Sequence, residues 1–193
     1  GGDRSLRAGS QMTTLSTGRT VRRDGGIYTY ERALQKRDYR AIAGIDEAGR
    51  GACAGPLVAA GVILKNPVPG LADSKLLTPK ARERAFDQIQ ESGAQIAVVA
   101  MSAQDCDDLG LHRANLTAMR RTVALLTPQP DFVLTDGYAV TGLPMESLAV
   151  WKGDRVSASI AAASIIAKVT RDRMMAQIHE RFSSFGFDRH KGY

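Results

Sequence analysis

Cysteine and histidine are scarce in this chain of 193 residues, which has two cysteines and three histidines. This set is too small for a disulfide scaffold, and it offers no convincing zinc site. The sequence also lacks any apolar run of the roughly 20 residues that a membrane span needs. Its longest apolar run, residues 55–64, has the length of a strand, and no apolar segment near residue 1 resembles a secretory leader. We therefore expect a cytoplasmic protein that does not enter the membrane.

The composition is that of a folded domain. Hydrophobic residues make up 44% of the chain and charged residues 24%, which excludes the disordered and fibrous classes. The length is sufficient for one globular domain and short for two. No internal repeat or low-complexity tract interrupts the sequence.

Positive charge is concentrated at the start of the chain. The formal net charge is +6, of which residues 1–40 carry +5 and residues 41–193 only +1. Residues 1–40 are therefore predicted to form a basic arm, in part disordered, ahead of a domain at 41–193. The arm could bind phosphate non-specifically, or it could be a solvated leader. Met12 is a second candidate for the initiating residue, which leaves the origin of residues 1–11 open.

Apolar periodicity and turn residues predict a mixed α/β architecture. Strands are predicted at 41–46, 57–64, 95–101, 131–135 and 148–151, and helices at 27–40, from 78 onwards, at 114–126 and at 157–182. Thr78 is a good N-cap and Pro79 suits the first helical turn, whereas Pro128 should end the helix before it. The last helix contains many small residues, such as Ala161 and Ala167, which would let it pack closely on a sheet.

Two adjacent carboxylates, Asp46 and Glu47, end the first of the long apolar strands. Burying unpaired acids is costly, so their position there is unusual. Strand alternation would send the two side chains to opposite faces. They can serve one site only if the chain bends, and Gly49 and Gly51 would permit a bend. The alternative is a solvated turn.

The same pattern recurs twice. Asp136 follows an apolar strand and is itself followed by glycine, and Asp154 follows the next strand and precedes the last helix. Convergent carboxylates without histidine or cysteine suit hard cations such as Mg²⁺ or Mn²⁺. Two such ions about 3.5–4 Å apart promote phosphodiester hydrolysis. The pattern therefore favours metal-dependent phosphoryl chemistry, although acids at strand ends also occur in ordinary turns. Asp172, a rival acid between two arginines, is better explained as a surface ion pair.

The order of these motifs is similar to that of bacterial type 2 ribonuclease H, or ribonuclease HII. The matching blocks are IAGIDEAGRG at 42–51, GPLV at 55–58, DSKLLT at 73–78, ANL at 114–116, DG at 136–137, KGD at 152–154, SASIAAASIIAKV at 157–169 and HKGY at 190–193. They span residues 41–193 at spacings like those of the family. The resemblance implies a ribonuclease H-like fold with a mixed five-stranded sheet flanked by helices.

The resemblance also implies an activity. Asp46, Glu47, Asp136 and Asp154 match the four catalytic, metal-binding carboxylates of the family, which use Mg²⁺ or Mn²⁺ in a two-metal site. The family cleaves RNA in RNA–DNA hybrids and cuts 5′ to a single ribonucleotide embedded in duplex DNA. It leaves 3′-hydroxyl and 5′-phosphate ends and serves ribonucleotide excision repair. We expect such an enzyme, acting as a monomer.

Recognition of ribose requires close approach to the 2′-hydroxyl, the group that distinguishes RNA from DNA. Gly49, Arg50 and Gly51 match the recognition loop of the family, and Tyr193 matches the tyrosine that packs on the neighbouring sugar. Further nucleic-acid contacts are expected from Ser74, Lys75 and Asn115, for each of which an ordinary surface or capping role is the alternative. Trp151 is expected in the core rather than as a platform for base stacking.

The match departs from the family after Tyr193, where family members normally continue with another helix and a basic tail. We expect Tyr193 to be prone to fraying. The alternative function is then a catalytically silent module that binds RNA–DNA hybrids. A DNA nuclease or strand-transfer enzyme of the same fold is a third alternative, but it would have no use for the recognition loop and Tyr193.

Overall fold

A mixed sheet forms the centre of the protein. The computed structural model describes residues 12–14, 20–22, 26–71 and 76–193. Its main sheet has five strands in the order β5–β4–β3–β6–β7. The strands are β3 (Ile42–Ala48), β4 (Leu57–Ile63), β5 (Gln95–Met101), β6 (Phe132–Asp136) and β7 (Glu146–Val150). β3, β4 and β5 pair antiparallel, whereas β3, β6 and β7 pair parallel. This arrangement confirms the predicted α/β class and mixed sheet.

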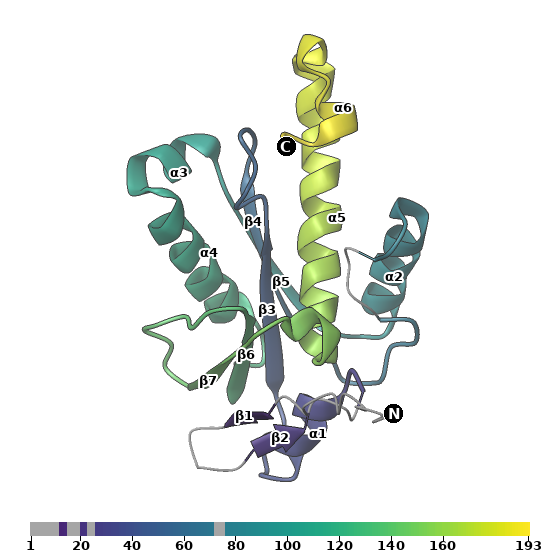
Figure 1. The fold of residues 1–193 in the computed structure, drawn as a ribbon, viewed down its shortest axis with the longest axis vertical. Helices are drawn as coiled ribbons and strands as arrows, with labels where there is room; N and C mark the ends of the chain where they lie inside the picture. The colour runs from purple at the N-terminus through teal and green to yellow at the C-terminus, as the bar shows by residue number, and fades with distance from the viewer. Residues whose placement is uncertain (1–11, 15–19, 23–25, 72–75) are drawn as a thin grey trace, which may run out of the picture.

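Helices cover both faces of the sheet (Figure 1). One face is covered by α2 (Pro79–Glu91) and α5 (Ala158–Arg181), and the other by α3 (Ala103–Leu109) and α4 (Leu111–Leu125). The remaining elements are α1 (Thr29–Gln35), α6 (Phe187–His190), the short 3₁₀ turns η1 (Gly153–Arg155) and η2 (Ser183–Phe185), and a separate pair of strands, β1 (Met12–Thr14) and β2 (Thr20–Arg22). Because both faces are covered, β4 is buried along its whole length.

The long helix α5 packs very closely on β3. A Cβ atom on Gly44 would lie 2.0 Å from the carbonyl carbon of Ser159, so only glycine fits at this crossing. The small residues predicted to allow such packing, including Ala161 and Ala167, are fully buried. No helix in the described part of the chain, α5 included, has the length and apolar character of a membrane span.

Most predicted elements form, with shifted ends. The hydroxyl of Thr78 accepts a hydrogen bond from the Ala81 amide, and Pro79 opens α2 as predicted. The structure adds α3, which the sequence analysis missed although Ser102 and Asp105 form a capping box at its start. The prediction that Trp151 lies in the core was wrong. Its side chain is 64% exposed, because it follows the end of the edge strand β7.

The helix α1 lies within the predicted arm, yet it is part of the folded domain. Tyr30 and Leu34 are fully buried. The carboxylate of Glu31 accepts hydrogen bonds from the hydroxyl of Ser157 at 2.6 Å, and from the amide and hydroxyl of Ser159 at 2.9 and 2.7 Å. A negative charge is favourable at this position, because the first turn of a helix presents unpaired amides and a positive dipole end. The boundary after residue 40 remains a prediction, but α1 caps α5.

Replacing Glu31 should therefore destabilise the protein. Glu31→Ala leaves the buried Ser159 amide and one of the two serine hydroxyls without an acceptor, and we expect the free energy of unfolding to fall by about 2–3 kcal/mol. Urea titration followed by circular dichroism measures the loss. The matched control is Glu91→Ala at the exposed end of α2, expected to change stability by less than about 0.5 kcal/mol. Equal effects of the two substitutions would contradict the capping role.

Candidate active site

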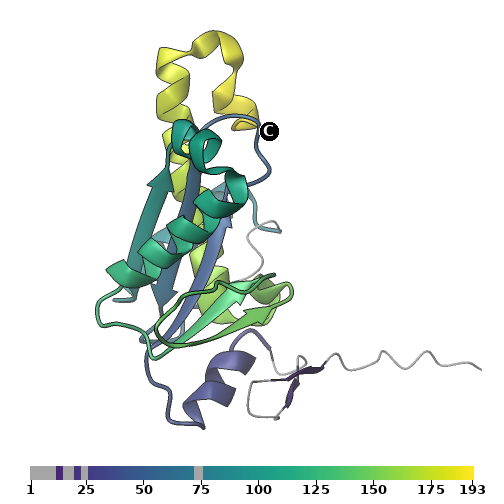
Figure 2. The same ribbon diagram turned by 90° about the vertical axis from the view of Figure 1, so that its left-hand side faces the viewer.

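A cavity of about 410 Å³ opens beside the end of β3. It is lined by Asp46, Glu47, Ala48, Gly49, Arg50, Gly51, Arg82, Asp136, Ser164, Lys168 and Tyr193. We call residues 49–56, between β3 and β4, the glycine loop, and residues 186–193 the terminal segment. Figure 2 shows the end of the terminal segment beside this loop. The cavity thus collects three of the four predicted carboxylates, the predicted recognition loop and Tyr193.

Asp46 and Glu47 reach the same cavity although they are neighbours on a strand. Pairing with β4 continues through both residues, so the expected bend is not what brings them together. Parallel pairing of β3 with β6 ends at Ile45 and Thr135 instead. The residues that follow on the two strands, Asp46 and Glu47 on one and Asp136 on the other, meet at that edge. Sites at the carboxyl ends of adjacent parallel strands are a general feature of α/β proteins.

Electrostatic repulsion is built into this site. Burial raises the pKa of Asp46 well above its ordinary value, and the charges of Glu47 and Asp136 raise it further. A hydrogen bond from the hydroxyl of Ser164 partly opposes these effects. The arrangement therefore favours a proton or a cation next to Asp46.

Glu47 lies in a more balanced environment. Burial raises the pKa of its carboxyl group, whereas the charge of Arg50 and a hydrogen bond from Tyr138 lower it. The Arg50 guanidinium lies 3.9 Å from the Glu47 carboxylate and stacks 4.9 Å from the centre of the Tyr138 ring. Burial and the charge of Glu47 raise the pKa of Tyr138, so its hydroxyl remains a donor. Glu47 is thus held by two groups, of which only Arg50 was singled out from the sequence.

Asn115 does not lie where the sequence analysis predicted. Its side chain has no exposed surface, so it cannot contact a phosphate directly in this structure. Its amide donates a hydrogen bond to the hydroxyl of Tyr138 instead. The side chain is turned inward because α4 packs its buried face against the sheet. Asn115 therefore acts on the cavity through Tyr138 and Glu47.

The structure keeps Asp154 out of the cavity lining. It is buried on η1, next to Gly153, whose amide donates a 2.7 Å hydrogen bond to Asp136. Asp136 and η1 are thereby linked, although Asp154 does not share the cavity with the other three acids. Ser74 and Lys75, the predicted phosphate contacts, lie outside the described residues.

The carboxylates fit a hard divalent cation in their chemistry. Asp46, Glu47 and Asp136 supply only oxygen donors, and their mutual repulsion is what a bound cation would relieve. Within the ranges that the structure describes, no three acidic, histidine or cysteine side chains are already arranged as ligands of one ion. The donor set is therefore suitable, whereas a finished coordination shell is not present.

Tyr193 is held at the cavity wall. The residue is 58% exposed, and the centre of its ring lies 5.3 Å from the Lys168 ammonium and 5.1 Å from the Arg171 guanidinium. Its amide donates to the carbonyl of His190 at 3.0 Å. These contacts argue against the fraying expected from the sequence, because two cations and a backbone hydrogen bond restrain the residue.

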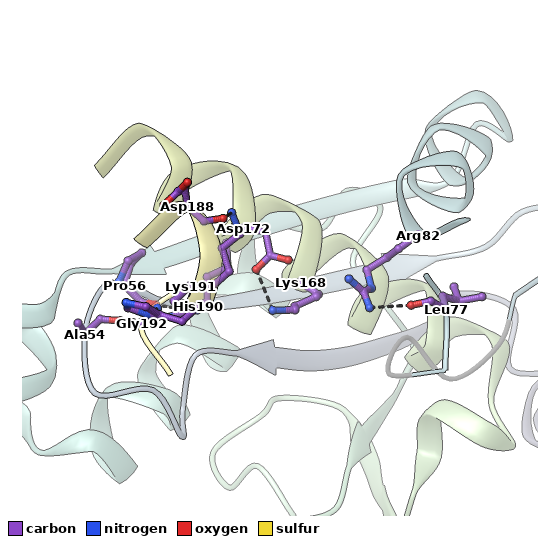
Figure 3. Close-up of polar contacts among 11 residues, drawn as sticks. Ala54, Pro56, Leu77, Arg82, Lys168, Asp172, Asp188, His190, Lys191 and Gly192 are labelled. Atoms are coloured by element: carbon purple, nitrogen blue, oxygen red, sulfur yellow. Dashed lines mark hydrogen bonds and ion pairs between the residues drawn. The ribbon is translucent and has the colours of Figure 1, made fainter. Parts of the chain in front are cut away.

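Two polar residues on α5, Ser164 and Arg171, and Arg82 on α2 lie in or beside the site without having been assigned to it from the sequence. Ser164, Lys168 and Arg171 recur at helical spacing on a helix otherwise rich in small apolar residues, and this pattern was the available signal. Lys168 also forms a 2.8 Å ion pair with Asp172, which confirms the predicted ion-pair role of that acid (Figure 3). Arg82 lines the cavity from α2 and donates to the carbonyl of Leu77 at 3.0 Å.

The raised pKa of Asp46 predicts a pH-dependent effect on stability. In metal-free buffer, the contribution of Asp46 to wild-type stability should fall as pH rises from the ordinary carboxyl pKa of about 4, because the folded state holds the Asp46 proton more tightly than the unfolded state. Asp46→Asn removes this penalty. At neutral pH it should be more stable than wild type by about 1 kcal/mol, a typical gain for one stabilising substitution.

Urea unfolding at pH 4 and pH 8 tests this prediction, and the gain should shrink at pH 4. Asp87→Asn, on the exposed face of α2, is the control and should show little difference between the two pH values. A destabilised Asp46→Asn variant at pH 8 would show that repulsion at Asp46 is smaller than the contribution of its hydrogen bonds.

Comparison with known proteins identifies the family. Residues 43–193 match the family described as "Ribonuclease HII". The chain is 55% identical over 186 residues to a ribonuclease HII of Nocardioides sp., which covers 94% of this chain and 78% of that protein. It is 57% identical over 177 residues to that of Salinispora tropica, covering 90% of this chain and 66% of that protein.

A solved structure supports the same assignment. The crystal structure of the ribonuclease H2 from Pyrococcus horikoshii superposes with a TM-score of 0.70 at 28% identity, over 80% of this chain and 81% of that one. Sequence and fold therefore agree. The chain belongs to the ribonuclease HII family, has the ribonuclease H fold and is a nuclease of the ribonuclease H type.

Proposed function

We propose that this protein is a metal-dependent endoribonuclease that hydrolyses the RNA of RNA–DNA hybrids. It also cuts 5′ to a single ribonucleotide in duplex DNA, leaving 3′-hydroxyl and 5′-phosphate ends, and acts as a cytoplasmic monomer in ribonucleotide removal. The observation that carries the proposal is one cavity shared by Asp46, Glu47, Asp136 and the Gly49–Gly51 stretch. Groups suited to phosphodiester hydrolysis lie there beside a backbone that can approach a sugar closely.

Asp46, Glu47 and Asp136 would hold Mg²⁺ or Mn²⁺ in a two-metal site, and Asp154 would join them from η1. Bound divalent ions activate water and stabilise the charge that develops on the phosphate. The hydroxyl of Ser164 keeps a lone pair of Asp46 engaged and so orients that carboxylate. Arg50, whose guanidinium lies 3.9 Å from the Glu47 carboxylate, attracts that carboxylate as an ion-pair partner in the same cavity lining.

Cations in the lining would neutralise the substrate backbone. Arg82 and Lys168 face the cavity from α2 and α5, the two helices on that side of the sheet. Contacts between such side chains and phosphate supply most of the sequence-independent affinity for nucleic acids. Ser74 and Lys75 remain proposed phosphate contacts beside them.

Selection of ribose would come from the glycine loop and Tyr193. Gly49 has a φ of +98°, which admits few side chains, and no described atom lies within 4 Å of a Cβ placed on Gly51. Backbone groups of the loop can therefore approach a 2′-hydroxyl, the covalent mark of RNA. The exposed ring of Tyr193 offers a surface on which the neighbouring sugar can pack.

Cleavage of a labelled DNA duplex with one ribonucleotide tests the proposal. We expect a single cut 5′ to the ribonucleotide that requires Mg²⁺ or Mn²⁺. Asp46→Asn and Asp136→Asn should each lower the rate by more than about 100-fold, since residues that bind a catalytic metal directly matter more than the residues that only orient them. Binding of an RNA–DNA hybrid, measured by fluorescence anisotropy, should be retained.

The matched control is Asp87→Asn, which removes a carboxylate from the exposed face of α2 and should cleave like wild type. Hybrid binding without any metal-dependent cut would favour the silent binding module instead. Equal cleavage of an all-DNA duplex would overturn the proposed recognition of the 2′-hydroxyl.

A further inference from the structure

Arg171 is a fully buried arginine beside the candidate active site. Burying a guanidinium is costly unless its N–H groups are satisfied. Its hydrogen bonds in the described structure go to three backbone carbonyls: Nε to Pro56 at 2.9 Å, Nη2 to Ala54 at 2.9 Å and Nη1 to Lys191 at 2.8 Å. The side chain thus binds backbone rather than a partner acid.

These carbonyls belong to two segments that are far apart in the sequence. Ala54 and Pro56 lie in the glycine loop, and Lys191 lies in the terminal segment, so one guanidinium bridges both. The two segments also touch directly, since the Cys53 amide donates to the carbonyl of Gly192 at 2.8 Å. Figure 3 shows Ala54, Pro56, Lys191 and Gly192 gathered at this junction.

Packing at the junction leaves no room for side chains at two glycines. A Cβ on Gly49 would lie 2.2 Å from Nε of Arg171, and one on Gly192 would lie 2.3 Å from the carbonyl oxygen of Ala54. Both glycines have positive φ values, +98° and +84°. The backbones of the loop and of the terminal segment therefore lie very close together, and the Arg171 side chain packs between them.

The same guanidinium contacts the aromatic ring at the cavity wall. Its Cζ atom lies 5.1 Å from the centre of the Tyr193 ring, within the range of a cation–π interaction. Arg171 also follows Ser164 and Lys168 at helical spacing on α5, and those two residues line the cavity. One face of α5 therefore connects Asp46, through Ser164, with the loop and with Tyr193.

We propose that Arg171 is a positioning residue for ribonucleotide recognition, which holds the glycine loop and Tyr193 in fixed relation to each other. This inference rests on the proposed function, because it assigns the two segments to the reading of one sugar and its neighbour. Arg171 acts through its carbonyl partners and the ring. An arginine suits this role, since its rigid fork of donors can satisfy several carbonyls at once, which a lysine ammonium cannot do with the same geometry.

The test compares Arg171→Lys and Arg171→Met with wild type on two substrates, a duplex with one ribonucleotide and a continuous RNA–DNA hybrid. On the first, kcat/KM should fall by about 10- to 100-fold, as expected for misplacement by around 1 Å. On the hybrid the loss of kcat/KM should be smaller. Every nucleotide of the RNA strand carries a 2′-hydroxyl, so a displaced loop can still contact one when the hybrid binds in a shifted position. A purely structural defect would lower kcat/KM on both substrates by the same factor.

Amide hydrogen exchange gives a second readout that does not require activity. In both variants the Cys53 amide, bonded to Gly192, should lose protection, while amides in the buried strand β4 keep theirs. If Arg171→Met does not fold, Gly192→Ala tests the same junction from the other side, because its Cβ would collide with Ala54. It should show the same loss on the single-ribonucleotide duplex.

Arg173→Met is the matched control. It makes the same change two residues further along α5, where the exposed Arg173 pairs with Glu83, and it should leave the ratio of the two activities unchanged. A folded Arg171→Met variant with the wild-type ratio, or with full protection at Cys53, would overturn the inference. Wild-type protein that cuts neither substrate would instead refute the proposed function.

Discussion

The contact between α5 and β3 is the constraint on which the remaining structure depends. Because Gly44 has no side chain, the backbone at Ser159 can lie directly against the strand, where any Cβ atom would collide with it. The contact lies at the N-terminus of α5, which Glu31 caps. Towards its C-terminus the helix runs past the cavity and then carries Arg171. Capping, carboxylate orientation and loop placement are therefore properties of a single rigid element.

The site combines two kinds of buried charge that are handled differently. Asp46, Glu47 and Asp136 repel one another across the cavity, and the protein keeps that repulsion, which raises the pKa of Asp46. Arg171 is instead satisfied by carbonyls. This difference has a physical logic, since carboxylates that repel one another attract cations, whereas a guanidinium bonded to three carbonyls holds backbone in place. The carboxylates are thus available for a cation, whereas the neighbouring arginine keeps the backbone around them in place.

The sequence predicted an element well where the element depends on residues that are close together in the chain. Thr78 and Pro79 begin α2, and the apolar run at residues 95–101 is β5, because capping and strand periodicity depend on adjacent residues. The predicted exposure of a side chain was wrong where segments distant in the sequence decide whether it is buried. Trp151 is apolar, and an edge position exposes it. Asn115 is polar, and the packing of α4 buries it, since a side chain's environment depends on segments distant in the sequence.

The amino-acid sequence by itself determined the chemistry available: carboxylates at strand ends without histidine or cysteine, a glycine-rich recognition loop, and the motif order of the ribonuclease HII family. The tertiary structure alone decided which of those groups share a cavity. It brought Asp136 beside Asp46 and Glu47 where the pairing between β3 and β6 ends, and it left Asp154, which is buried on η1, out of the cavity lining. It also joined the two segments around Arg171. No local pattern specifies such pairings, because they arise only when strands and helices pack.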